Sequence, residues 1–92
     1  MRILIIEDDA SLTELLSYGL EDEGFSVDIC QDGYEGLFLA LQESHDIILL
    51  DRMLPSLAGE SILKCMRQDG VKTPVIFITA LGEAAEKING LD

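Results

Sequence analysis

The sequence predicts an α/β fold in which helices cover both faces of a doubly wound parallel sheet. Short apolar runs at residues 3–6, 47–50 and 75–79 alternate with longer segments in which apolar residues recur at helical spacing. A strict alternation of strand and helix makes the strands parallel and sends the crossover helices to both faces. Strands covered on both faces need apolar side chains in both directions, which explains the continuous runs.

The composition indicates one folded domain, and we expect residues 1–92 to form it. Hydrophobic residues make up 48% of the chain, which is enough for collapse into a core. The net charge of −12, from 18 acidic and 6 basic residues, disfavours contact with DNA phosphates. The apolar runs are too short to span a membrane and the N-terminus does not resemble a signal peptide, so we expect a cytoplasmic protein without membrane contact.

The first half of the chain contains two strand–helix units. After the strand at residues 3–6, Ser11 and Glu14 have the spacing of a capping box, and the helix ends near Gly24. The inner face of this helix is predicted to carry four leucines, Leu12, Leu15, Leu16 and Leu20. A shorter strand is expected at residues 27–30.

Asp32 and Glu35 form a second capping signal, which predicts the start of the second helix. The inner face of that helix is predicted to carry Leu37, Ala40 and Leu41. A third helix over residues 60–68 follows the third strand and buries Ile62, Leu63 and Met66. A fourth helix is expected over residues 83–89, after the fourth strand.

The cysteines and the single histidine give no sign of a metal or redox site. Cys30 and Cys65 lie within apolar patterns without metal-ligand spacing, so we interpret them as small core residues in a reducing compartment. His45 lies between a helical segment and a strand, and we interpret it as a helix-end residue rather than a ligand or base.

Polar residues stand where the apolar strands end. Glu7, Asp8 and Asp9 follow the first strand, Asp51 follows the third, and Thr79 ends the fourth. Ligands of doubly wound sheets bind beyond the carboxyl ends of the strands, so these side chains converge if the first and third strands are neighbours. Two like charges ~4 Å apart repel by ~4 kcal/mol at an effective dielectric near 20. Oxygen ligands without histidine or cysteine select a hard cation, which predicts a Mg²⁺ site.

Any one of these acids alone would be interpreted as a polar residue closing a strand, but three acids and a hydroxyl at one edge favour a functional site. A metal site alone has no need of Thr79. A carboxylate beside Mg²⁺ can act as a nucleophile toward phosphorus, and a threonine hydroxyl can bond a phosphoryl oxygen. The pattern therefore makes Asp51 a candidate for an aspartyl phosphate.

Three segments closely resemble the receiver domains of two-component response regulators. ILIIEDDA is similar to their first strand and acidic pair, IILLDRMLPSLAG to the phospho-acceptor strand and loop, and TPVIFITAL to the strand with the switch threonine. GEAAEKINGLD is similar to the helix that follows, so the resemblance is collinear over the whole chain. It implies a flavodoxin-like sheet with strand order 2-1-3-4, in which the usual fifth strand and fifth helix are missing.

The resemblance also implies the roles of individual residues. Asp51 is the implied phospho-acceptor, and Glu7, Asp8, Asp51 and the backbone carbonyl of Met53 are the implied Mg²⁺ ligands. Thr79 is the implied switch hydroxyl, and Met53 and Leu81 would flank the entrance to the phosphorylation site. The DRMLP loop resembles that of OmpR-like regulators, which have a winged-helix DNA-binding output domain.

The sequence departs from the family at two places. Ala58 stands where members usually have an aspartate, which removes a helix cap at a cost of ~1 kcal/mol. The chain ends at Asp92, before the lysine of the fifth strand that normally contacts the phosphoryl group. From the resemblance we expect a C-terminally truncated receiver that is phosphorylated slowly.

Three classes of function remain in competition. The first is a phospho-accepting signalling domain with a sensor histidine kinase as partner. It would reach DNA only through an output domain outside this chain, and would have no enzymatic activity beyond Mg²⁺-dependent self-phosphorylation and autodephosphorylation. The second is a truncated receiver that acts as an interaction module, self-associating through the edge of the strand at residues 75–79 or through the fourth helix. The third, a metal-dependent phosphatase or nuclease, needs Asp-x-Asp after the first or third strand, where this chain has Glu-Asp-Asp and Asp-Arg-Met.

Overall fold

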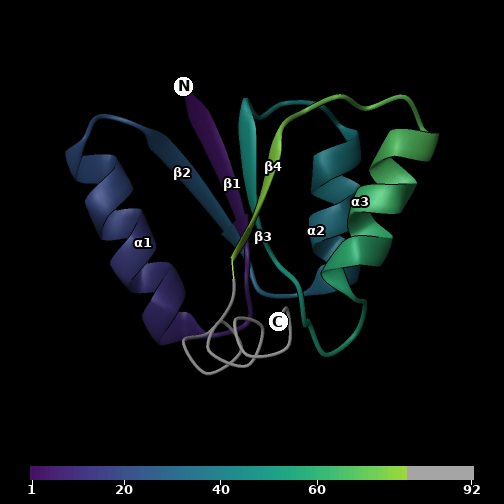
Figure 1. Ribbon diagram of the computed structural model, residues 1–92. Coiled ribbons are helices and arrows are strands. Elements are labelled where there is room, and N and C mark those ends of the chain that lie inside the picture. Colours follow the sequence, from purple (N-terminus) through teal and green to yellow (C-terminus); the bar gives the residue numbers. More distant parts are fainter. Residues whose placement is uncertain (79–92) are drawn as a thin grey trace, which may run out of the picture.

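The computed structural model describes residues 1–78 and contains a four-stranded parallel sheet in the order β2-β1-β3-β4 (Figure 1). In chain order the elements are β1 (Arg2–Ile6), α1 (Ala10–Asp22), β2 (Ser26–Cys30), α2 (Gly33–Leu41), β3 (Ile47–Asp51), α3 (Gly59–Gln68) and β4 (Val75–Ile78). Helix α1 lies on one face of the sheet, and α2 and α3 lie on the other (Figure 1). The predicted doubly wound fold and strand order are confirmed.

The element bounds agree with the sequence prediction to within about one residue, except at the start of α1. Strand β3 extends one residue further than predicted and includes Asp51 as its last residue. The predicted end of the fourth strand at Thr79 and the predicted helix at residues 83–89 lie outside the described residues. None of the helices described is long and apolar enough to cross a membrane.

The central strands β1 and β3 carry the core of the domain. Strand β1 pairs with β2 on one side and with β3 on the other, and all of its residues except the first, Arg2, are buried. The cluster against α2 and α3 combines strand and helix residues, among them Leu4, Ile6, Ile48, Leu50, Ala40, Ile62 and Met66. Burying one such aliphatic side chain contributes about 1.5–3 kcal/mol, so the β1–β3 pair is a rigid base for the residues at its ends.

The predicted start of the first helix is wrong. Asp9, not Ser11, is the N-cap: its Oδ1 accepts from the backbone N–H of Ser11 (2.9 Å) and of Leu12 (3.2 Å). The extended backbone of Asp9 allows this carboxylate to satisfy free amides of the first turn, so the helix already begins at Ala10.

The predicted inner face of α1 is wrong at one position. Leu15 is 70% exposed, while Thr13 is buried and Leu16 and Leu20 are half-buried. The stripe that faces the sheet runs through Thr13, Leu16 and Leu20, and Leu15 lies outside it on the helix surface.

Helix α2 starts as predicted, and α3 starts without a side-chain cap. Asp32 Oδ2 accepts from the backbone N–H of Glu35 (2.9 Å). At α3 the cap position is Ala58, which has extended backbone and makes no capping bond. The next residue, Gly59, donates its N–H to the carbonyl of Arg52 (2.9 Å), and a Cβ at Gly59 would overlap the carbonyl oxygen of Asp51. Helix α3 can therefore begin directly against the end of β3 only because residue 59 has no side chain.

His45 and Cys30 are both buried, in different surroundings. Cys30 belongs to the apolar core, as predicted. His45 lies between α2 and β3, with Nε2 2.7 Å from Asp28 Oδ2, and Asp28 also accepts from Arg2 Nη2 (2.8 Å). His45 is thus tied to β2, which the helix-end interpretation missed. These contacts lower the pKa of Asp28, the His45 hydrogen bond most.

We expect Ala58→Ser to raise the free energy of unfolding by about 1 kcal/mol, because a serine hydroxyl at this position can accept from an amide in the first turn of α3. Urea unfolding of the whole chain measures the change. Ala58→Val, which adds bulk without an acceptor, is the control. Equal stability of the serine and valine variants would contradict the assignment of the cap position.

We expect Gly59→Ala to lower the free energy of unfolding by roughly 1–3 kcal/mol, because the new methyl group overlaps backbone atoms that cannot move independently. The matched control is Gly19→Ala in α1, where no atom lies within 4 Å of the added Cβ. That change should stabilise the helix by about 0.5–1 kcal/mol. Two shifts of the same sign in urea unfolding would refute the close approach at Gly59.

Candidate metal centre

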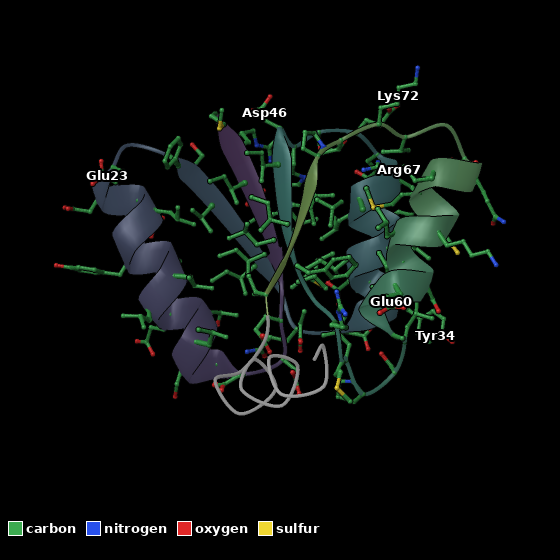
Figure 2. All side chains as sticks on the ribbon, in the orientation of Figure 1. Glu23, Tyr34, Asp46, Glu60, Arg67 and Lys72 are labelled. Atoms are coloured by element: carbon green, nitrogen blue, oxygen red, sulfur yellow. The ribbon has the colours of Figure 1, made fainter. Side chains whose placement is uncertain are left out.

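A cluster of carboxylates lies at the carboxyl ends of β1 and β3. The register pairs Ile6 with Leu50, so the next residues, Glu7 and Asp51, come out side by side. One carboxylate oxygen from each of Glu7, Asp8 and Asp51 lies within 4.8 Å of the others. Asp46, which precedes β3, lies at the opposite end of that strand and takes no part in the cluster (Figure 2).

The three acids differ in exposure and in how they are held. Glu7 and Asp51 are only 3% and 5% exposed, while Asp8 is exposed to solvent. The backbone N–H of Asp9 donates to Glu7 Oε2 (2.9 Å), and that of Met53 donates to Asp51 Oδ1 (3.1 Å). Two carboxylates are therefore fixed by burial and by backbone amides, and the third is at the solvent side of the cluster.

Burial and repulsion within the cluster make the two buried carboxyl groups, Glu7 and Asp51, weaker acids than ordinary carboxyl side chains. Burial raises the pKa of Glu7 to about 7, and the Asp8 and Asp51 carboxylates add to this rise while the Asp9 amide opposes it. Burial also raises the pKa of Asp51, against the hydrogen bond from the Met53 amide. Without a cation, Glu7 is therefore partly protonated near neutral pH.

The donor set of the cluster fits a hard divalent cation. Its three carboxylate oxygens come without a histidine or cysteine ligand, which matches the preference of Mg²⁺ for a few carboxylates completed by water or carbonyl oxygen. Met53 follows Asp51 by two residues. The hydrogen bond from its backbone N–H to Asp51 Oδ1 keeps the backbone of Met53 beside the cluster. A bound cation would offset both the burial of the carboxylates and the repulsion that adds to it in raising the two pKa values.

The remaining residues of the predicted site are placed only in part. Thr79 and Leu81 lie outside the described residues. The register pairs Ile78, the last described residue of β4, with Asp51. Asp9 lies next to the cluster, but its carboxylate caps α1 and is not one of the three grouped oxygens.

One contact next to the site was missed by the sequence analysis. The side chain of Arg52 crosses to β4, where its guanidinium carbon lies 4.8 Å from the centroid of the Phe77 ring. Its Nη1 lies 3.6 Å from Glu60 Oε1 in the first turn of α3. The signal available was the strand alternation, which puts Arg52 on the same side of the sheet as Leu50 and hence as Phe77.

Comparisons with known proteins agree with this geometry. The transcriptional regulatory protein DltR of Streptococcus agalactiae is 46% identical over 92 residues, which is all of this chain and 41% of that protein. The receiver domain of the Francisella response regulator 1452 is 36% identical with a TM-score of 0.81, covering 98% of this chain and 74% of that one. The chain spans about two fifths of the length of the curated relatives it matches.

A second similar structure carries a metal. It is the receiver domain of a sensor histidine kinase from Pseudomonas aeruginosa PAO1, described with a magnesium ion coordinated in its active site cleft. It is 30% identical with a TM-score of 0.79, covering 87% of this chain and 67% of that one. The family model of the response regulator receiver domain matches residues 3–92. Because this match takes in nearly the whole chain, the chain belongs to the response regulator receiver domain family.

Proposed function

We propose that this chain is a phospho-accepting receiver domain of a two-component response regulator, and that Asp51 is its phospho-acceptor. The observation that carries the proposal is a carboxylate fixed at the end of a buried strand with two further carboxylates beside it. Membership of the receiver family and the magnesium in the cleft of the similar Pseudomonas structure support it.

In the proposed reaction, a carboxylate oxygen of Asp51 forms a bond to the phosphorus of a donor. The bond from phosphorus to the donor nitrogen or oxygen breaks, and its electron pair leaves with the donor. The Met53 amide holds Oδ1 of Asp51, so the carboxylate keeps one orientation as the donor approaches. Mg²⁺ held by Glu7, Asp8, Asp51 and the Met53 carbonyl would neutralise the phosphoryl oxygens.

The wider roles follow from the same proposal. Thr79, as the switch hydroxyl, would donate a hydrogen bond to the phosphoryl group. Met53 and Leu81 would flank the entrance to the phosphorylation site. The donor would be a sensor histidine kinase. The chain would lie in the cytoplasm and would accept the phosphoryl group rather than act on a separate substrate. DNA contact would belong to an output domain outside this chain, because the net charge of −12 on this chain repels DNA phosphates.

Self-association remains a separate prediction. Within residues 1–78, β4 pairs only with β3, and Ile76 on β4 is exposed. The family match gives no support to an interaction module as the main function.

We expect Mg²⁺ to raise the midpoint of thermal unfolding, and to do so more strongly above pH 7 than below it. The folded-state pKa of Glu7, about 7, lies above its ordinary value of 4.5, so the cation-free folded state binds more protons than the unfolded state between these values. Stability of the cation-free protein therefore falls as the pH rises through this window, and Mg²⁺ restores it where protons no longer compete.

Two variants make the Mg²⁺ measurement specific. Asp8→Asn should lose most of the Mg²⁺-induced rise in the midpoint of thermal unfolding. Asp22→Asn, which removes a carboxylate from the last turn of α1, should keep this rise. A shift of the same size in Asp8→Asn and in the unmodified chain would show that the cation binds elsewhere.

We expect acetyl phosphate with Mg²⁺ to add one phosphoryl group to the chain, detected by intact-mass spectrometry. Asp51→Asn should give no adduct, because an amide is not a nucleophile toward phosphorus. Asp22→Asn should behave like the unmodified chain, and a chelator should suppress the reaction. An adduct on Asp51→Asn would exclude Asp51 as the phospho-acceptor.

A further inference from the structure

Arg52 links the strand that carries Asp51 to the neighbouring strand β4. Arg52 comes directly after Asp51, and its guanidinium carbon lies 4.8 Å from the centroid of the Phe77 ring. A guanidinium at this distance is attracted to the face of an aromatic ring and can stack on it. Phe77 is followed by Ile78, which is paired with Asp51 in the sheet. The contact therefore fixes β4 one residue away from the pairing partner of Asp51.

Arg52 also joins the start of α3 to the same point. Its carbonyl accepts from the N–H of Gly59 (2.9 Å), and its Nη1 lies 3.6 Å from Glu60 Oε1. The side chains of Arg52 and Glu60 are 32% and 67% exposed, so this ion pair contributes little to stability. The stacking on Phe77 is thus the stronger of the two side-chain contacts.

Within the described residues, the guanidinium of Arg52 contacts the Phe77 ring and Glu60. Arg52 Nε is buried and has no hydrogen-bond partner within residues 1–78. Through the Phe77 contact and the Gly59 hydrogen bond, Arg52 can affect Asp51 by placing the neighbouring β4 and α3.

We propose that Arg52 is a positioning residue for phosphoryl transfer, which holds the carboxyl end of β4 beside Asp51 by stacking on Phe77. The inference rests on the proposed function of Asp51. Residues that hold reacting groups in register act mainly on the maximal rate, because a misplacement of about 1 Å can cost about 100-fold. Because the proposed role of Arg52 is to place the strands and not to contact the donor, the half-saturating concentration of the donor should not change.

The experiment measures the initial rate of adduct formation on the full chain over a range of acetyl phosphate concentrations, by intact-mass spectrometry. Arg52→Met keeps the apolar stem but loses the guanidinium, and we expect the maximal rate to fall about tenfold or more at an unchanged half-saturating concentration. Arg52→Lys keeps a cation that can lie over the ring without the planar group, and should recover part of the rate.

The matched control is Arg67→Met. Figure 2 shows Arg67 and Glu60 towards opposite ends of α3, and Arg67 Nη1 donates to the carbonyl of Val71 (2.7 Å). This variant loses the same charge and a contact of its own, so it reports the effect of a general loss of stability. We expect it to be phosphorylated at the rate of the unmodified chain.

Phe77→Leu provides the second test, and keeps the proposal falsifiable if Arg52→Met fails to fold. It should slow the reaction as Arg52→Met does, and the double variant should be no slower than either single variant, because both changes break one contact. Multiplying effects, a normal rate in Arg52→Met, or a change only in the half-saturating concentration would overturn the role of Arg52. Absence of an adduct on the unmodified chain would instead remove the proposed function, and this inference with it.

Discussion

Parallel pairing of β1 with β3 brings two buried strands to an end at one edge of the sheet, with Glu7 beyond one and Asp51 on the other. Burial of the aliphatic side chains along these strands is favourable, and it forces two carboxyl groups into a poorly solvated place. Their pKa values rise as a result. The same pairing that stabilises the core thus creates a site that favours a cation, and the proposed chemistry depends on this constraint.

The acids around the site divide the structural and chemical roles among themselves. The carboxylate of Asp9 caps the start of α1, and its backbone N–H donates to Glu7. One residue therefore both begins a helix and orients a neighbour in the cluster. Gly59 lets α3 begin against the carbonyl of Asp51, which closes the loop that contains Met53. Adjacent acids in a sequence can therefore have unrelated roles, and only their contacts separate them.

The sequence predicted a doubly wound parallel sheet because strand and helix periods alternate without a break, whereas the strand order came from the resemblance to receiver domains. It also brought Glu7, Asp8 and Asp51 into one region, because parallel strands end at the same edge. It failed at Ser11 and Leu15, where cap geometry and the orientation of α1 decide between similar residues. The Arg52–Phe77 contact joins residues distant in sequence: strand alternation puts both side chains on one face of the sheet but does not specify that they meet.

The two ends of the sheet are held together very differently. Towards the amino ends of β1 and β3, Asp28 of β2 bonds to both Arg2 and His45, which ties β2 to β1 and to the segment before β3. At the carboxyl ends, Glu7, Asp8 and Asp51 repel one another. A cation bound at the carboxyl ends would replace this repulsion by attraction, so both ends of the sheet would then be joined by opposite charges or hydrogen bonds.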